Sequence, residues 1–321
     1  MSTIECSLII RSYNEEKHIG KLLEGVKRQT IFNNIEVIVV DSGSTDGTVA
    51  IAREAGARIV NISPEDFSFG RALNIGCENA RGKYLLFASA HVYPLYTDWI
   101  EKMLRPFYKD KVALVYGRQV GNEITRYSEE QLFKKWFPGA SNYDQKIPFC
   151  NNANAVVRKD LWEEQPYDEE LTGLEDLDWA TKIMQKGYSI AYESTATIVH
   201  VHEETPSRIK NRYRREAIAL KNIYPDEKFN FLSFCKLSIG NIWSDSVHAL
   251  HDGRFLKEFR FIVIFRTLQF WGTYKGYRQK SKPDETLRMR FYYPNEVKNK
   301  LFKKKAELSA TELGERIVYN S

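Results

Sequence analysis

The sequence feature that most constrains the fold is the stretch from Ile35 to Thr48. It begins with an apolar run rich in β-branched residues, which is typical of a strand buried on both faces of a parallel sheet. The run ends at Asp41, small residues follow, and a helical pattern starts near Asp46. A carboxylate at the carboxyl end of a parallel strand lies where open α/β sheets bind ligands. The stretch therefore predicts either a ligand-binding turn or an ordinary turn in which Asp46 caps the helix.

Alternating strand and helix patterns surround this stretch. Apolar runs predict strands at residues 4–10, 35–40, 57–62, 84–88, 112–116, 155–158, 189–192 and 197–201, and helical spacing predicts helices at 18–29 and 99–108. The first three alternations of strand and helix predict an α/β fold with a doubly wound sheet. The pattern changes near residue 205, so we expect an α/β domain over residues 1–204 and a helical region over 205–321.

Cysteine usage and the start of the chain bear on the compartment. The four cysteines lie far apart, with no spacing typical of a disulfide framework or a metal site. The first residues lack the basic segment and apolar core of a secretory signal, and no run of about 18 apolar residues predicts a membrane span. We therefore expect a cytoplasmic location.

Charge is distributed unevenly. Residues 205–321 contain 24 Lys and Arg against 12 Asp and Glu, a net charge of +12, so residues 1–204 carry −7 within the whole-chain value of +5. Aromatic residues alternate with these basic groups from residue 254 to 271. Such a composition fits amphipathic helices on an anionic membrane, at the inner face of the cytoplasmic membrane. It fits equally a helical subdomain that packs on the α/β domain or on a second copy of the chain. We expect no nucleic-acid partner.

Four motifs in order carry a family resemblance between Ile4 and His202. They are RSYNE at 11–15, EVIVVDSGSTDGT at 36–48, GRALN at 70–74 and LEDLDW at 174–179. Together they resemble the inverting family 2 glycosyltransferases of the GT-A fold. The resemblance implies transfer of a sugar from a nucleotide-sugar donor to a hydroxyl of a glycan or lipid-linked acceptor, in the assembly of a bacterial surface polysaccharide.

The resemblance assigns donor-binding roles to the first motifs. Tyr13, Glu15 and Asp41 match the positions that hold the nucleoside, although a helix-leading loop without a ligand would also explain the first two. Arg71 and Asn74 share a helix face and match a segment beside the base and diphosphate. Arg71 could pair with phosphate as a planar fork, or it could be a surface arginine above a helix-facing asparagine.

The metal position departs from the family pattern. Relatives carry D-x-D after the fourth strand, whereas this chain has Ser89, Ala90 and His91. His200 and His202 alternate along a predicted strand and so point to one face, and the resemblance assigns His202 as a second ligand. Imidazole nitrogen favours Mn²⁺ over Mg²⁺ as the divalent cation. The alternative is a metal-free site in which imidazolium neutralises the diphosphate.

The last motif places three carboxylates at a helix start, where the helix dipole favours anions. The resemblance makes Asp176 the general base with Glu175 as its support, and gives Asp178 and Trp179 to the acceptor side. Without the resemblance, these acids would be helix caps. The asparagine-rich segment 149–154 could bind sugar hydroxyls or form a satisfied turn.

Two functions of other classes compete with this interpretation. A sugar nucleotidyltransferase would show a glycine-rich, basic loop directly after the first strand, where this chain has RSYNE. A non-catalytic binding module of the same fold is suggested by the missing D-x-D carboxylates.

Overall fold

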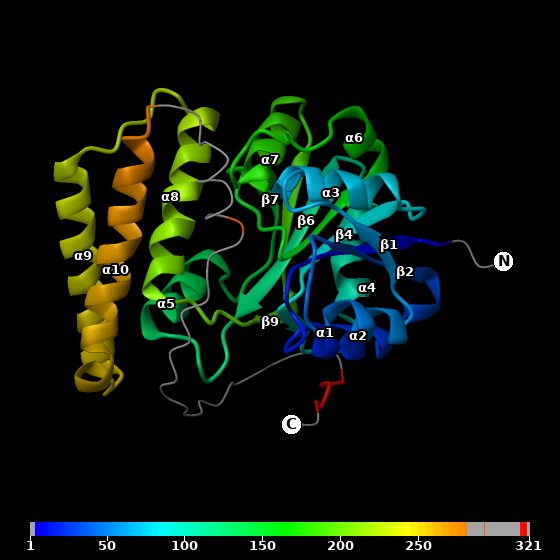
Figure 1. Ribbon diagram of the computed structural model, residues 1–321, viewed down its shortest axis with the longest axis horizontal. Helices are drawn as coiled ribbons and strands as arrows, with labels where there is room; N and C mark the ends of the chain where they lie inside the picture. The colour runs from blue at the N-terminus through cyan, green and yellow to red at the C-terminus, as the bar shows by residue number, and fades with distance from the viewer. Residues whose placement is uncertain (1–3, 281–291, 293–314, 320–321) are drawn as a thin grey trace.

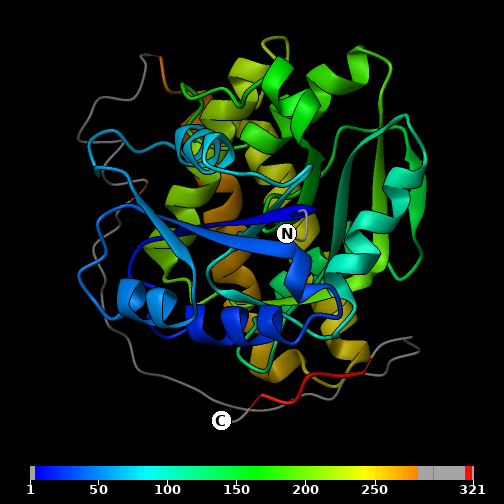
Figure 2. The ribbon, with the colours of Figure 1, turned by 90° about the vertical axis from the view of Figure 1, so that its right-hand side faces the viewer.

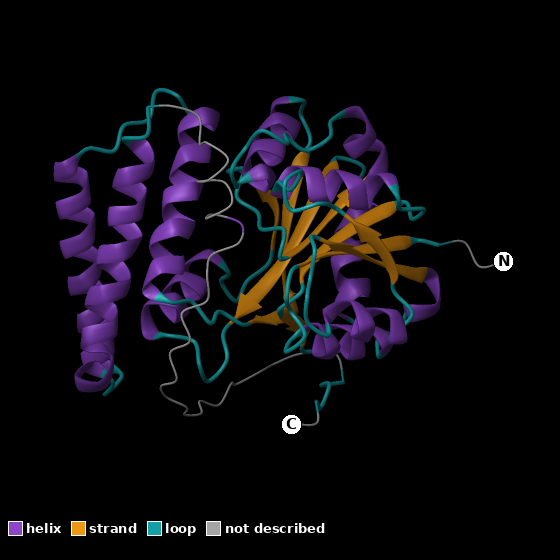
Figure 3. Cartoon of the chain, viewed as in Figure 1, coloured by secondary structure: helices purple, strands orange, loops and turns teal. Residues whose placement is uncertain are grey.

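The computed structural model describes residues 4–280, 292 and 315–319. Its central feature is a mixed sheet, which helices cover on both faces (Figure 3). The strands are β1 (Cys6–Ser12), β2 (Ile35–Asp41), β3 (Arg58–Asn61), β4 (Tyr84–Ser89), β5 (Val92–Pro94), β6 (Val112–Val120), β7 (Asn142–Gln145), β8 (Asn154–Arg158) and β9 (Ser189–His200). The sheet order is β3-β2-β1-β4-β8-β6-β9-β5, and β7 pairs with β9.

The helices follow the strands in chain order (Figure 1). They are α1 (Ile19–Lys27), α2 (Thr48–Glu54), α3 (Phe69–Glu78), α4 (Trp99–Leu104), α5 (Tyr127–Trp136), α6 (Lys159–Glu164), α7 (Glu175–Gln185), α8 (Pro206–Ile223), α9 (Phe231–His251) and α10 (Phe255–Tyr277), with 3-10 turns at Phe32–Asn34 and Arg105–Tyr108. None of the described helices is long and apolar enough to cross a membrane.

The amino-terminal half of the sheet confirms the doubly wound prediction. β1, β2, β3 and β4 are mutually parallel, with β1 between β2 and β4. Side chains alternate along β1, so Leu8 and Ile10 enter one core cluster while Ile9 enters the other. Figure 2 shows α1 and α2 on one side of these strands and α3 on the opposite side. The carboxyl ends of four parallel strands therefore share one edge, where the candidate site lies.

The second half of the sheet differs in two places from expectation. The two short strands expected near residue 190 form one strand, β9, whose register against β6 shifts at Gly117 and Gln119. Such a shift is a β-bulge or similar irregularity, at which a continuous strand bends. The alternation of apolar and polar residues is interrupted there, while the pairing of the two strands continues. The helix expected at 99–108 ends at Leu104 and continues as a 3-10 turn at Pro106, which lacks the N–H of a helix interior.

The carboxy-terminal helices pack on the α/β domain through the first turn of α5. The Tyr127 hydroxyl donates to Asp252 at 2.7 Å, and the Ser128 hydroxyl donates to Asp245 at 2.6 Å. Asp245 is itself paired with Arg266 of α10 at 2.7 Å, and both side chains are buried. α10 lies between α8 and α9, and Figure 1 shows α9 at the edge farthest from the sheet. Helices are thus present over residues 206–277 of the region predicted at 205–321, and they contact the α/β domain, whereas most of residues 281–321 lie outside the described part of the chain.

Candidate active site

The turn after β2 is organised by the carboxylate of Asp41. This side chain is 3% exposed and accepts hydrogen bonds from the Ser12 hydroxyl at 3.0 Å and the Ser44 backbone N–H at 2.9 Å. The N–H of Gly43 donates another at 3.1 Å, and Gly43 has a left-handed φ of +92°, which costs glycine little. Asp41 therefore shapes the loop at the sheet edge, and its contact with a nucleoside stays a prediction.

The loop after β1 lies against this turn. Asn14 has a φ of 53°, which is uncommon outside glycine, and its side-chain oxygen accepts the N–H of Thr45 at 2.9 Å. The carboxylate of Glu15 lies 2.8 Å from Nδ1 of His91, and Tyr13 is 37% exposed beside them. Backbone strain of this kind clusters at functional sites. Glu15, which was expected to contact the nucleoside, therefore contacts His91, which was expected to bind the metal.

The acid pair at the start of α7 follows a second left-handed residue, Leu174, with a φ of 56°. Glu175 forms an ion pair with Arg11 from the end of β1 at 3.1 Å. Asp176 is 8% exposed and accepts a hydrogen bond from the backbone N–H of Asn152 at 3.1 Å. The two carboxylates thus reach the carboxyl edge of the sheet from a helix whose dipole favours their charge.

Burial and the negative charge of Glu175 raise the pKa of Asp176 to about 7, while backbone N–H groups and Arg11 oppose the shift in part. A carboxylate is then half protonated near neutral pH, where a general base both accepts and releases a proton readily. A strongly shifted carboxyl group beside a specific charge partner is also typical of catalytic sites.

Two residues expected to serve the acceptor have other roles. Trp179 is 1% exposed within the core, and its indole N–H donates to the Gln165 carbonyl at 2.6 Å, so the expectation of a sugar-stacking surface is wrong. Trp179 is one of the residues on the buried face of α7, so its ring fills the core instead of facing a substrate. Asp178 is also buried and pairs with Lys182 one helical turn later at 2.6 Å.

The pair expected beside the diphosphate is split between surface and core. Asn74 is 4% exposed, and its amide is fully engaged, with Trp162 donating at 3.0 Å and the Tyr167 carbonyl accepting at 2.9 Å. Its expected contact with the donor is therefore wrong. Arg71 is half exposed and lies 3.7 Å from Glu169. It lines an open pocket in which all the other charged residues are acidic, namely Glu65, Asp66, Glu169 and Glu170. The negative charge of these four carboxylates disfavours binding of a phosphate in this pocket.

Two arginines that the sequence analysis did not assign lie closer to the acid pair. The guanidinium groups of Arg11 and Arg215 lie over the ring of Phe69 at 4.6 Å and 4.4 Å from its centroid. The Arg215 carbonyl also accepts from the hydroxyl of Thr172, just before the acid pair. Arg11 could have been noticed from its place at the end of the first strand. Arg215 could not, because it comes from α8, which is distant in sequence.

The asparagine-rich segment is partly a satisfied turn. Asn151 accepts from the side chain of Gln119 at 3.0 Å, and Asn154 accepts from Trp99 at 2.9 Å. Asn152 differs, because both polar atoms of its buried amide lack a hydrogen-bond partner among the described residues. An unpaired buried amide costs about 1–3 kcal/mol unless a ligand or water completes it. Asn152 beside Asp176 is thus a candidate for a substrate contact.

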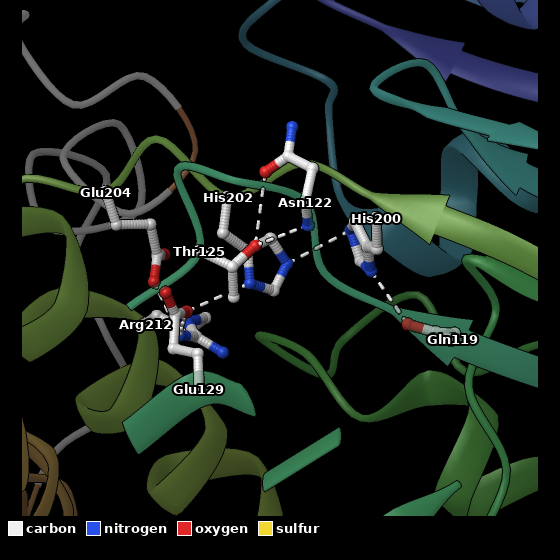
Figure 4. Close-up of polar contacts among 8 residues, drawn as sticks. All are labelled: Gln119, Asn122, Thr125, Glu129, His200, His202, Glu204 and Arg212. Carbon is white, nitrogen blue, oxygen red and sulfur yellow. Dashed lines mark hydrogen bonds and ion pairs between the residues drawn. The ribbon is translucent and has the colours of Figure 1, made fainter. Parts of the chain in front are cut away.

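Three imidazoles gather at the end of β9. His91, His200 and His202 each offer a nitrogen, and these atoms lie within 4.8 Å of one another. The predicted alternation is confirmed, since Nε2 of His200 and Nε2 of His202 are 3.1 Å apart (Figure 4). His200, which was not chosen as a ligand, is the most buried of the three. Ser89 ends β4 beside Arg11 of β1.

Each imidazole has its Nδ1 fixed by an oxygen acceptor. Nδ1 of His91 faces Glu15 at 2.8 Å, Nδ1 of His200 faces the Gln119 side-chain oxygen at 2.7 Å, and Nδ1 of His202 faces Glu129 at 3.0 Å. A carboxylate or amide oxygen can only accept, so a neutral imidazole in this setting would carry its proton on Nδ1 and leave its Nε2 lone pair available. This orientation of histidines by carboxylates and amides is the usual arrangement around a bound metal.

The distance between Nε2 atoms also fits a shared ion. Two ligands at about 2.05 Å from one ion, at tetrahedral or octahedral angles, lie about 2.9–3.4 Å apart. Two facing lone pairs at 3.1 Å would otherwise repel one another unless a proton bridged them. Burial and the neighbouring imidazoles hold the pKa of His200 well below its usual range, which disfavours that proton. The residues therefore fit a divalent cation.

A second acidic group beside His202 is unsuited to a metal. Glu129 and Glu204 also lie within reach of His202. The guanidinium of Arg212 already occupies this space, 2.5 Å from Glu204 and 3.4 Å from Glu129 (Figure 4). Its fixed charge replaces a cation there, so Glu129 serves to orient His202 and Arg212 balances the carboxylates.

The mixed sheet and the helices on both its faces form a fold of the GT-A type. The chain is similar to glycosyl transferase family 2, whose model matches residues 7–165. The O-antigen chain rhamnosyltransferase RfbN of Salmonella typhimurium is 28% identical over 223 residues, which cover 65% of this chain and 70% of that protein. The O-antigen chain rhamnosyltransferase WbaN of Salmonella anatum is 30% identical over 190 residues, 56% of this chain and 60% of that protein.

Solved structures share the fold at lower sequence identity. The mannosyltransferase PcManGT from Pyrobaculum calidifontis, in complex with GDP-Man and Mn²⁺, superposes with a TM-score of 0.61 at 19% identity and covers 87% of this chain and 88% of its own. S. aureus TarS 1-349 in complex with UDP-GlcNAc gives a TM-score of 0.51 at 18% identity, covering 83% of this chain and 90% of its own. These likenesses confirm the expected GT-A architecture.

Proposed function

We propose that this protein is an inverting glycosyltransferase that moves a sugar from a nucleotide-sugar donor to a hydroxyl of a glycan or lipid-linked acceptor. The observation that carries the proposal is Asp176, a buried carboxylate with a pKa raised to about 7 at the edge of the sheet. It lies beside an arginine-paired glutamate, and the polar segment 151–152 connects it towards Gln119 and the histidine cluster. This arrangement supplies a base together with cationic groups for a leaving diphosphate.

Each residue of the site has its own role in the proposed reaction. Asp176 accepts the proton of the acceptor hydroxyl as that oxygen forms a bond to the anomeric carbon. The bond between the anomeric carbon and the diphosphate oxygen breaks on the opposite face, which inverts the configuration. Arg11 and Arg215 lie where they can stabilise the charge that develops on the diphosphate. The side-chain amide of Asn152, which has no hydrogen-bond partner among the described residues, orients a sugar or acceptor hydroxyl next to the base.

A divalent cation belongs to this proposal, and His91, His200 and His202 are the residues that would hold it. When bound, it would act as a Lewis acid that neutralises charge on the diphosphate oxygens. Three nitrogen ligands favour Mn²⁺ or later first-row ions over Mg²⁺, which prefers oxygen and retains its waters. The Mn²⁺ named with PcManGT supports a cation in this fold. The names of the Salmonella relatives support a polysaccharide acceptor and a deoxyhexose donor.

A screen of nucleotide sugars as donors tests the proposed activity. UDP-, GDP-, dTDP- and CMP-sugars, including a dTDP-linked deoxyhexose, are compared in thermal-shift assays with and without Mn²⁺, followed by donor hydrolysis and transfer assays. We expect one nucleotide class to raise the melting temperature and its sugar to be released or transferred. Formation of a sugar nucleotide and pyrophosphate from a sugar phosphate and a nucleoside triphosphate would instead indicate a nucleotidyltransferase. Tight donor binding without turnover towards any acceptor or water would indicate a binding module.

The nucleoside loop gives a separate prediction. Asp41→Ala should weaken binding of the cognate nucleotide by about tenfold or more, because it removes the acceptor for N–H groups of Gly43 and Ser44 and a charged hydrogen bond contributes roughly 1.5–3 kcal/mol. Isothermal titration calorimetry measures the effect. Asp160→Ala, an exposed acid that pairs with Arg158, is the matched control and should bind as the wild type does. Unchanged affinity in Asp41→Ala would leave the loop with a purely structural role.

A further inference from the structure

An apolar stripe runs along the outer face of α9. Five apolar residues and one lysine recur every three or four residues and so share one side of the helix, namely Leu232, Lys236, Ile239, Trp243, Val247 and Leu250. All six are exposed, and Leu232, Ile239 and Trp243 are exposed by 74%, 68% and 73%. From Leu232 to Leu250 the stripe is about 27 Å long at 1.5 Å per residue.

The stripe continues past the turn into α10. Leu256 is 97% exposed and Phe259 is 43% exposed at the start of that helix. The other side of α9 packs on α10 and α5, and Figure 1 shows its outer side turned away from the rest of the molecule. A contiguous exposed apolar surface of this length marks an interaction site.

Charges on these two helices identify what the surface would contact. Both acidic side chains of α9 and α10, Asp245 and Glu258, are buried at 3% exposure, and Asp245 pairs with Arg266. The exposed ionic side chains of the two helices are all basic or histidine: Lys236, His248, His251, Lys257, Arg260 and Lys275. Between Phe231 and Tyr277 the one exposed acid is Asp252, in the turn between the two helices, and it accepts a hydrogen bond from Tyr127.

We propose that the α9 stripe and the start of α10 form a docking surface for an anionic lipid membrane, in which the apolar residues enter the interface and the basic residues face lipid headgroups. A second copy of the chain fits less well, because a two-fold contact through these helices would bring basic residues such as Lys236 and Lys257 towards basic residues of the other copy, with no exposed carboxylate on either helix to pair with them. An in-plane amphipathic helix with basic flanks is suited to this role. The proposal does not depend on the donor or the reaction.

Flotation of the full chain with lipid vesicles tests the surface. Vesicles of neutral phosphatidylcholine are compared with vesicles that contain phosphatidylglycerol, at low and high salt. We expect binding to anionic vesicles that weakens as salt rises, because salt screens exposed charges. The variant Ile239→Gln/Trp243→Gln should lose binding to both vesicle types, whereas Lys236→Glu/Lys257→Glu should lose at least about tenfold in binding to anionic vesicles only, since each surface charge contributes about 1 kcal/mol.

The control substitutes an exposed apolar residue elsewhere. Ile147→Gln removes a side chain that is 55% exposed outside the helical region, and it should bind vesicles as the wild type does. Circular dichroism confirms that each variant folds, which the exposure of the substituted side chains favours. Absence of vesicle binding by the wild type would overturn the proposal. So would a dimer in light scattering that Ile239→Gln/Trp243→Gln dissociates, because the stripe would then be a subunit interface.

Discussion

Asp176→Asn is expected to lower kcat by about 10²-fold or more, the usual scale for loss of a general base, while donor affinity changes little. The amide keeps the size of the side chain, and its oxygen can still accept the N–H of Asn152, so the local structure should persist. What it cannot do is take the proton of the acceptor hydroxyl. Steady-state transfer assays and donor titration calorimetry measure the two quantities separately.

The pH profile distinguishes a base from a positioning residue. Because the pKa of Asp176 is raised to about 7, the wild-type kcat/KM should increase with pH and reach half its maximum near that value. The residual activity of Asp176→Asn should lack this limb. The same raised pKa means that protonated Asp176 stabilises the fold at low pH, and that this contribution is lost as pH rises through about 7. At pH 8 the variant should therefore be at least as stable as the wild type in chemical denaturation.

Asp178→Asn is the matched control on the same helix. Asp178 is a neighbouring carboxylate that pairs with Lys182, away from the acid pair's contacts with Arg11 and Asn152. It should retain most of the turnover. If Asp176→Asn turned over at a near-normal rate, the assignment of Asp176 as the base would be refuted, whatever Asp178→Asn did.

The parallel half of the fold could be predicted because each of its strands leaves a pattern within a few consecutive residues of the sequence. A strand such as β2, buried on both faces, requires a continuous apolar run, and the acid that ends it is visible in the sequence. Antiparallel insertion of β8 between β4 and β6 was not predictable, since no local pattern distinguishes its partners. The sequence predicted two short strands where the structure has one, β9. The reason is a register shift against β6, which interrupts the alternation of side chains while the strand continues.

The site was predictable only where its residues share one element. His200 ends β9 and His202 follows it two residues later, and Glu175 and Asp176 open one helix, so their proximity followed from spacing. The contact of Glu15 with His91 needed the pairing of β1 with β4, which is a tertiary fact. The errors at Asn74 and Trp179 have the same origin, because polar or aromatic side chains on a helix do not reveal which face is buried.

The histidine cluster yields the second large expected effect. His202→Ala should abolish tight Mn²⁺ binding, because it removes one of two Nε2 atoms that lie 3.1 Å apart, as ligands of one ion do. Glu129→Gln keeps all three imidazoles but replaces the carboxylate that holds Nδ1 of His202, so we expect about 10–100-fold weaker binding. Electron paramagnetic resonance of free Mn²⁺ measures both without an activity assay.

Two comparisons make the metal result specific. His248→Ala removes an exposed imidazole on α9 that bonds only to the Ser244 carbonyl among the described residues, and it should bind Mn²⁺ as the wild type does. Mg²⁺ should compete poorly with Mn²⁺, since nitrogen ligands suit the latter better. Full transfer activity in excess chelator, with His91→Ala still inactive, would reject the cation. The imidazole of His91, paired with Glu15, would then have to stabilise the diphosphate directly, and loss of Glu15 should lower turnover as severely as loss of His91.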